Sequence, residues 1–258
     1  MSHLVFDAVT KTFQSRTGPI PVVEPFDLEV AKGEIVVFLG PSGCGKTTLM
    51  RMVGGLETPT TGAIRLGGAV LGKPDRRRGM VFQSYSSFPW LTVEENVAFG
   101  MRYRGDLGAA EKRDRARHFL GVVGLTEFAA SYPNRISGGM RQRVAIARTL
   151  AAGSDVLLMD EPFGALDAQR REQLQVELRR ILEADAKTIV FVTHDVEEAA
   201  FLADRVVVFT RRPARTLALV DVTARLGAHR DLETRDSRAF FELRSELLHL
   251  VRSTAEDT

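Results

Sequence analysis

The chain has 258 residues, of which 44% are hydrophobic and 26% are charged, values that are ordinary for a folded globular protein and exclude a disordered or fibrous chain. Its formal net charge of +2 is too small, and its basic residues are too evenly mixed with acidic ones, to favour nucleic acid as a partner. The single cysteine, Cys44, excludes an intramolecular disulfide, and no apolar run approaches the ~20 residues of a membrane-spanning helix. The first residues also lack the features of a secretory signal, so we expect a protein that is not exported.

The N-terminal third of the chain predicts short strands separated by turns. Strand-like segments lie at residues 4–6, 26–30 and 35–38, and the last of these is continuously apolar, as a central strand covered on both faces would be. It leads into a glycine-rich turn and a helix that we expect to begin at about Lys46. Residues 62–66 and 69–71, separated by two glycines, predict a surface hairpin.

The rest of the chain alternates between helical and strand patterns. Helical spacing dominates residues 92–150 and predicts an inserted helical subdomain, after which strands are expected at 156–159, 188–192 and 205–209. A helix is expected between the first two of these strands, so parallel pairing with helical crossovers follows. The apolar stripe of Phe240, Leu243, Leu247 and Val251 predicts a packing helix near the end. The predicted fold class is therefore α/β, with a mainly parallel sheet, a small antiparallel β subdomain and the helical insertion.

Residues 40–47, here called the phosphate loop, carry the first motif with a chemical meaning. They fit the pattern G-x-x-x-x-G-K-[ST] between a predicted strand and a predicted helix, a context that disfavours a mere glycine-rich turn. In such a loop the backbone N–H groups surround phosphates, Lys46 reaches the β and γ phosphates, and Thr47 ligates Mg²⁺. Thr48 can add a hydroxyl group at the α phosphate. The loop comprises Gly40, Pro41, Ser42, Gly43, Cys44, Gly45, Lys46 and Thr47.

Two further strand ends carry candidate catalytic groups. Asp160 and Glu161 follow an apolar strand, and adjacent carboxylates there can divide the work, with Asp160 holding the Mg²⁺ hydration shell and Glu161 activating water. A solvated strand end is the alternative for this pair. His194 follows another apolar strand and is a candidate γ-phosphate contact, although a structural histidine is the more common occurrence.

A second glycine-rich segment, Ser137-Gly138-Gly139, stands at the expected start of a helix that Ser137 can cap. Its exposed N–H groups would attract an anion, yet the phosphate loop already accounts for one nucleotide. The residues alone leave open whether this segment is only a helix cap.

Together these motifs resemble those of the ATP-binding-cassette (ABC) ATPases, and the resemblance extends over about residues 3–210. It implies ATP and Mg²⁺ as cofactors and two chains packed head to tail, so that Ser137, Gly138 and Gly139 of one chain close over ATP held by Lys46 of the other. The matching segments, in the family's order, are the phosphate loop, Gln83, Ser137-Gly138-Gly139, Asp160-Glu161, Ala165-Leu166-Asp167 and His194.

The resemblance also implies roles for residues that the chemistry alone does not single out. Phe13 would stack on adenine, Gln83 would link Mg²⁺ and the attacking water to the helical subdomain, and Asp167 would cross the dimer interface. Two positions depart from the family's usual pattern: Met140 replaces a glutamine, and Gly164 stands where serine is frequent. We expect neither departure to abolish activity. At Met140, the phosphate contacts of the segment Ser137-Gly138-Gly139 come from Ser137 and backbone amides, so they do not depend on the glutamine side chain.

The segment 83–93, read with 136–140, is similar to the nitrate, sulfonate and taurine importer branch of the family. That branch implies an ATPase subunit that energises uptake of a small anion, lies on the cytoplasmic face of the inner membrane, and works with permease subunits and, indirectly, a solute-binding protein. Tyr85, Phe88 and Trp90 would lie where the helical subdomain receives the permease, although buried core is an equal alternative for these aromatic side chains.

We therefore expect one ABC ATPase domain over residues 1–258. Its nucleotide-binding core with the β subdomain would comprise residues 1–85 and 153–210, its helical subdomain residues 86–152, and its C-terminal extension residues 211–258. The competing hypotheses are a non-transport ABC ATPase acting on nucleic acid or ribosomes, which would usually carry a coiled-coil insertion or two cassettes, and a phosphate-loop kinase or GTPase working alone. The second of these leaves the Ser137 segment unexplained.

Overall fold

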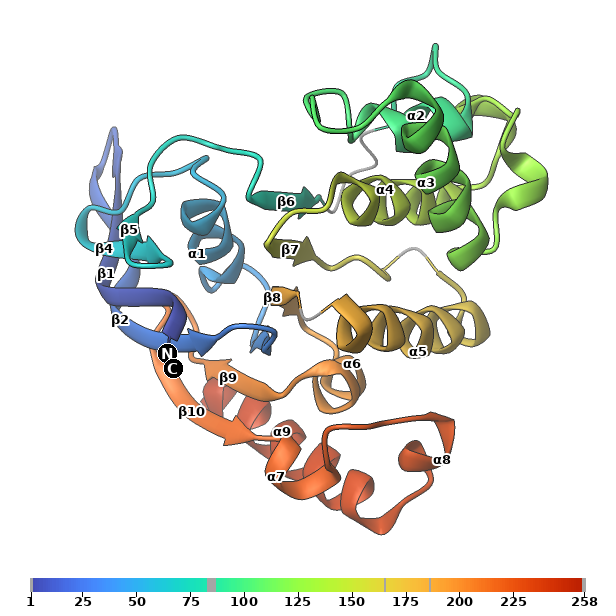
Figure 1. The fold of residues 1–258 in the computed structure, drawn as a ribbon. Helices are drawn as coiled ribbons and strands as arrows, with labels where there is room; N and C mark the ends of the chain where they lie inside the picture. Colours follow the sequence, from blue (N-terminus) through green and yellow to red (C-terminus); the bar gives the residue numbers. More distant parts are fainter. Residues whose placement is uncertain (1, 83–86, 165, 186, 257–258) are drawn as a thin grey trace. The chain divides into compact units, whose positions relative to one another are not determined.

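The computed structural model describes residues 2–82, 87–164, 166–185 and 187–256 (Figure 1). The chain divides into two units: unit 1 comprises Met1–Asp75 and Arg179–Thr258, and unit 2 comprises Arg76–Leu178. Gln83, Tyr85 and Ala165, which the sequence analysis names, lie outside the described residues. Within the described part of the chain, no helix combines the length and the apolar character that crossing a bilayer requires.

An antiparallel sheet in unit 1 is built around two long strands. β1 (Ser2–Ser15) and β2 (Gly18–Ala31) pair along their length, β4 (Thr61–Leu66) pairs with β1, and β5 (Ala69–Val70) closes the hairpin at the edge. The hairpin prediction is confirmed. β1 and β2 are longer than predicted because register shifts, one of them at Ala8 with a φ of 45°, let pairing continue where the apolar alternation breaks.

The parallel strands of unit 1 place the loops that matter for function. β3 (Ile35–Leu39) lies between β8 (Thr188–Thr193) and β9 (Arg205–Phe209), and both neighbours run parallel to it, as predicted. β10 (Thr216–Asp221), which the sequence analysis did not predict, pairs antiparallel with β9. Every residue of β3 and β8 is buried, which explains their continuously apolar sequences.

Aromatic side chains join these two sets of strands. The rings of Phe6, Phe26, Phe38 and Phe209 form a cluster whose neighbouring centroids lie 5.1 to 6.1 Å apart. The cluster links β1 and β2 to β3 and β9, so the antiparallel and parallel strands of unit 1 share one core. Large aromatic side chains contribute most to such cores because each buries a large apolar area.

Helices follow the parallel strands of unit 1. α1 (Lys46–Val53) begins at the predicted residue, and α6 (Val196–Leu202) packs against β3 and β8. α9 (Arg238–Glu256) packs against α6 and β9 and buries Phe240, Leu243 and Leu247, which confirms the predicted packing helix. Two short helices, α7 (Thr223–Leu226) and α8 (Leu232–Arg235), precede it.

Unit 2 combines a parallel strand pair with a group of helices. β6 (Arg78–Val81) pairs with β7 (Val156–Asp160), and α4 (Gly138–Ala152) packs against β6. The helices α2 (Val93–Phe99), α3 (Ala109–Val122) and α4 pack against one another, with two short 3₁₀ turns, Thr126–Phe128 and Pro133–Arg135, between α3 and α4. α5 (Ala168–Asp185) begins in unit 2 and continues into unit 1.

Candidate active site

The phosphate loop connects β3 to α1 and needs its glycines for two reasons. Gly40, Gly43 and Gly45 have positive φ angles of 158°, 76° and 126°, which residues with a side chain rarely adopt. A Cβ atom on Gly45 would also lie 2.8 Å from the carbonyl oxygen of Val22, whereas one on Gly43 would meet open space. The loop is therefore tightly packed on one side and open on the other.

Lys46 places a positive charge inside this loop. Its side chain is 4% exposed, and its Nζ donates hydrogen bonds to the carbonyl oxygens of Gly40 at 2.8 Å and Pro41 at 2.7 Å. No carboxylate of the described residues forms an ion pair with it. Because α1 starts directly at Lys46 and Gly45 offers no side chain to cap it, the ammonium group and the positive end of the helix favour an anion at the same place. These features fit a bound polyphosphate.

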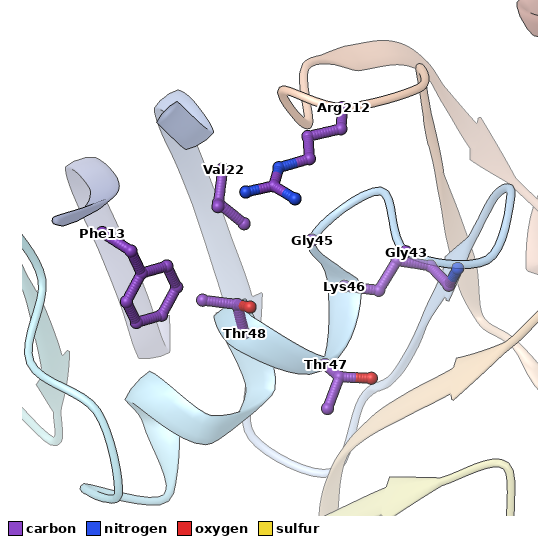
Figure 2. Close-up of a pocket in the computed structure, with 8 residues that line it drawn as sticks. All are labelled: Phe13, Val22, Gly43, Gly45, Lys46, Thr47, Thr48 and Arg212. Atoms are coloured by element: carbon purple, nitrogen blue, oxygen red, sulfur yellow. The ribbon is translucent and has the colours of Figure 1, made fainter. Parts of the chain in front are cut away.

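A hollow of about 340 Å³ opens beside the loop (Figure 2). Its volume is in the range of small-molecule binding pockets. Phe13, with 36% of its surface exposed, forms part of the wall, and the Nζ of Lys11 lies 4.7 Å from the centre of its ring. The lining residues are Phe13, Val22, Gly43, Gly45, Lys46, Thr47, Thr48 and Arg212. Of these, Val22 and Arg212 were not singled out by the sequence analysis.

His194 lies at the same edge of the parallel strands as the phosphate loop. β3 and β8 are in register with Leu39 opposite Thr193, so Gly40 and His194 follow directly from paired residues. His194 is exposed, whereas Thr193 directly before it is buried. The apolar strand before His194 predicts this position from the sequence alone.

The turn that carries His194 is fixed by buried hydrogen bonds. The hydroxyl group of Thr193 donates to Glu198 Oε2 at 2.7 Å and accepts from the backbone N–H of Asp195 at 2.9 Å. Asp195 in turn caps α6, because its Oδ1 accepts from the N–H groups of Glu197 and Glu198. Thr193 and Glu198 are 1% and 5% exposed, a degree of burial that no sequence motif signalled.

In unit 2, Ser137 is the N-cap of α4, as expected. Its Oγ accepts a hydrogen bond from Met140 N at 3.3 Å, and the side chain is exposed. At the other end of α4, Arg104 Nη1 donates to Ala152 O at 3.1 Å and Arg115 Nε donates to Ala151 O at 2.8 Å. Cations neutralise the C-terminal end of the helix, while its N-terminal end presents a hydroxyl group and two half-buried glycines.

The two adjacent carboxylates of unit 2 have different environments. Asp160 ends β7 and is 7% exposed, whereas Glu161 is half-buried and has a φ of 47°. The carbonyl oxygen of Glu161 accepts hydrogen bonds from Gln142 Nε2 and Gly164 N, both at 3.3 Å. Gln142, on α4, is 2% exposed and was not among the predicted site residues.

Asp167 directly precedes α5 and has a local structural role. Its Oδ1 accepts from Arg170 N at 3.0 Å, which caps the helix. Burial and the neighbouring Arg170 lower the pKa of Arg143, and Asp167 raises it. Asp167 therefore lies near the positive charges of Arg143 and Arg170.

The aromatic side chains expected at a permease groove differ in exposure. Phe88 is half-buried, and its ring centre lies 4.3 Å from that of Phe99 on α2. Trp90 is 71% exposed, and its ring centre lies 5.7 Å from that of Phe88. The packing of Phe88 agrees with the core alternative, whereas Trp90 faces solvent in the described unit.

Comparison with known proteins decides the family. The sequence pattern of the family described as ABC transporter matches residues 23–164, more than half of the chain. The chain belongs to this family. The ABC ATPase is 43% identical to a nitrate import ATP-binding protein of Synechococcus elongatus, over 98% of this chain and 93% of that protein. It is 41% identical to an aliphatic sulfonates import ATP-binding protein of Bacillus cereus, over 93% of this chain and 92% of that protein.

A solved structure gives the same result for the fold. A dimeric ATP-binding cassette in a post-hydrolysis state, bound to ADP and Pi, is 33% identical and superposes with a TM-score of 0.77, covering 85% of this chain and 98% of that one. The predicted fold class, a phosphate-loop NTPase core in an α/β protein, is therefore confirmed. The ABC ATPase binds and hydrolyses ATP as a transport subunit.

Proposed function

We propose that this ABC ATPase energises the import of a small anion, nitrate or an aliphatic sulfonate. The observation that carries the ATP-dependent part is Lys46, an unpaired cation among the described residues, held by backbone carbonyls beside a hollow of about 340 Å³. The names of relatives that are 43% and 41% identical over nearly the whole chain support import and the class of solute.

The residues of unit 1 bind and position the nucleotide in this proposal. Phe13 stacks on adenine, the N–H groups of the phosphate loop surround the β and γ phosphates, and Lys46 neutralises their charge. Thr48 adds a hydroxyl group near the α phosphate, and His194 contacts the γ phosphate from the end of β8. The rest of the phosphate loop surrounds the phosphates with its backbone. These residues are Gly40, Pro41, Ser42, Gly43, Cys44, Gly45 and Thr47.

Mg²⁺ is the metal that fits the donors of this site. Thr47, Gln83 and Asp160 would hold it, and a hydroxyl, an amide oxygen and a carboxylate are the hard oxygen ligands that Mg²⁺ prefers. The ion would supply charge neutralisation on the phosphates when bound. The chain's own base is Glu161, which orients water and accepts its proton, so that hydrolysis depends on the position of this carboxylate.

The active unit in this proposal is a head-to-tail pair of chains. Ser137, Gly138 and Gly139 at the N-terminal end of α4 close over ATP bound to the other chain, and Asp167 lies at the interface. The dimeric state of the solved relative bound to ADP and Pi supports this arrangement. Permease subunits are the membrane partners, with the exposed Trp90 near their docking region, and a solute-binding protein acts through them.

The location and the domain boundaries follow from the same proposal. The ATPase lies on the cytoplasmic face of the cell membrane as a peripheral subunit. Residues 1–85 and 153–210 form the nucleotide-binding core with its β subdomain, residues 86–152 form the helical subdomain that meets the permease, and residues 211–258 form a C-terminal extension.

The nucleotide part of the proposal is tested by replacing Lys46. We expect Lys46→Ala to weaken ATP binding by about 10- to 100-fold, because a charge-assisted contact to the phosphates is lost. Lys32→Ala, which removes an exposed lysine from the turn before β3, is the matched control and should bind like the unchanged chain. Equal affinities for all three chains would contradict the assigned site.

The import part is tested in vesicles that contain the ATPase with its permease and solute-binding protein. We expect either nitrate or an aliphatic sulfonate to stimulate ATP hydrolysis and to accumulate in the compartment that receives the solute. Hydrolysis that neither anion stimulates, in a complex that responds to another solute, would contradict anion import and leave the ATPase activity intact.

A further inference from the structure

Arg212 reaches the nucleotide hollow although it belongs to none of the motifs above. It lies in the loop 210–215 between β9 and β10, 165 residues after Thr47 at the end of the phosphate loop. Its side chain nevertheless lines the same hollow as Phe13 and Lys46. Figure 2 shows its guanidinium group directed toward Val22, in the region between Phe13 and the phosphate loop.

The loop that carries Arg212 is held in place by backbone hydrogen bonds. Ala214 N donates to Val22 O at 2.8 Å, and Glu24 N donates to Ala214 O at 3.1 Å, so the loop is fastened along β2. Within the loop, Thr210 N donates to Arg215 O at 3.0 Å. A loop closed and anchored in this way carries its side chain on a backbone that loses little conformational entropy on binding.

The same loop touches the phosphate loop. A Cβ atom on Gly45 would lie 3.1 Å from the Cβ of Ala214 as well as 2.8 Å from Val22 O. β2, the loop 210–215 and the start of α1 thus converge at one wall of the hollow. Among the residues that line the hollow, Arg212 and Lys46 carry the cationic groups.

Arg212 keeps most of its hydrogen-bonding capacity. Its side chain is exposed, and its Nε donates to Pro21 O at 3.5 Å, the upper limit for a hydrogen bond. No described carboxylate forms an ion pair with it, whereas Arg215 in the same loop pairs with Glu24 at 3.3 Å. A guanidinium group carries five N–H donors, which suit phosphate oxygens and hydroxyl groups.

We propose that Arg212 binds the ribose and α-phosphate part of ATP. The inference rests on the proposed nucleotide site, with the base at Phe13 and the β and γ phosphates at the phosphate loop. Between these two ends, Val22 and Arg212 line the hollow, and the part of a nucleotide that lies between its base and its β phosphate is the ribose with the α phosphate (Figure 2). A cation there binds ATP and ADP alike.

Nucleotide affinity in a set of variants tests this role. We expect Arg212→Ala to weaken binding of ATP, ADP and GTP by a similar factor of about 5 to 20, and Arg212→Lys to recover part of the loss. The affinity for inorganic pyrophosphate, which fills only the positions of the β and γ phosphates, should stay unchanged. Arg215→Ala is the matched control, because it removes a cation from the same loop outside the hollow.

Three results would overturn the role of Arg212. They are unchanged ATP affinity in Arg212→Ala, an equal loss for pyrophosphate, which would indicate general attraction of anions, and a loss for ATP without a loss for GTP, which would move the contact to the base. Thermal unfolding of each variant shows that the fold is intact. Failure of the unchanged chain to bind ATP would overturn the proposed function and this inference together. If the unchanged chain binds ATP, and Lys46→Ala weakens this binding while Arg212→Ala does not affect it, this inference alone would be overturned.

Discussion

Glu161 is held in a backbone conformation that few residues with a side chain adopt. Only Ala8 and Glu161, among the non-glycine residues that the structure describes, have a positive φ, and that of Glu161 is 47°. Such a conformation costs about 1–3 kcal/mol and persists where the surroundings enforce it. Gln142 and Gly164 supply part of that enforcement through the carbonyl oxygen of Glu161. The strained backbone of Glu161 agrees with a role in which its carboxylate must keep one orientation.

Replacing the carboxylate of Glu161 tests its assignment as the base. We expect Glu161→Gln to bind ATP normally but to lower turnover by about two to four orders of magnitude, the usual loss for a general base. Single-turnover hydrolysis and equilibrium binding, measured on the same preparation, separate the two effects. Glu172→Gln, on the exposed start of α5, is a control that should hydrolyse ATP normally. Near-normal hydrolysis by Glu161→Gln would remove this residue from the role.

Gln142 should influence catalysis through the backbone of Glu161. We expect Gln142→Leu to lower kcat by about tenfold, because small displacements of a catalytic group are costly, and to leave the ATP affinity unchanged. Its Nε2 is the donor to Glu161 O, and its Oε1 is buried without a partner among the described residues, so the loss of stability should be small. Steady-state kinetics with a parallel binding measurement check this. A change in affinity with a normal kcat would contradict a positioning role.

At the scale of elements, strand ends and helix starts form the site, and the sequence indicates them unequally. The apolar runs of β3, β7 and β8 predict buried strands, and the polar residues after them predict the site at their ends. The extents of β1 and β2 could not be predicted, because their pairing continues through bulges and polar residues. β10 could not be predicted either, because an edge strand with Leu217 and Leu219 exposed lacks the alternation of a half-buried strand.

The junction between β8 and α6 shows how an element end can be tested. We expect Thr193→Val to lower the free energy of unfolding by about 1–3 kcal/mol, because the buried Glu198 Oε2 loses a donor and Asp195 N loses an acceptor. Chemical denaturation measures the change. Thr216→Val on the exposed start of β10 is the control and should stay within about 0.5 kcal/mol of the unchanged chain. A loss no larger than that of the control would show that the buried hydrogen bonds at Thr193 contribute little.

At the scale of the whole molecule, the predictability of the site depends on how local each part is. The phosphate loop was predicted in full because its chemistry lies in eight consecutive residues between a strand and a helix. Arg212 was not, because its position depends on β2 and the loop 210–215 meeting the phosphate loop, which are contacts between distant parts of the sequence. Phe13 was named only through the family resemblance, since nothing in the residues around it signals a base-binding wall.

If Lys46 of one chain and Ser137 of another bind the same nucleotide, two chains must associate when ATP is bound. ATP that is bound but not hydrolysed should hold the two chains together, so we expect Glu161→Gln to change from monomer to dimer when Mg²⁺ and ATP are added, as measured by light scattering. Adding Ser137→Arg should prevent the change, because a large side chain at the N-terminal end of α4 would occupy the space of the other chain's phosphates.

The control for that experiment is Ser253→Arg in the same Glu161→Gln background, since Ser253 is an exposed serine on α9 and the substitution is chemically the same. This variant should still form dimers with ATP, which separates the loss of an interface from the mere addition of a bulky cation. ATP binding by Ser137→Arg should remain near normal in the monomer, because the phosphate loop of the same chain is untouched. Monomers under all conditions in Glu161→Gln would contradict the two-chain site, and dimers that persist in the Ser137→Arg variant would move the interface away from α4.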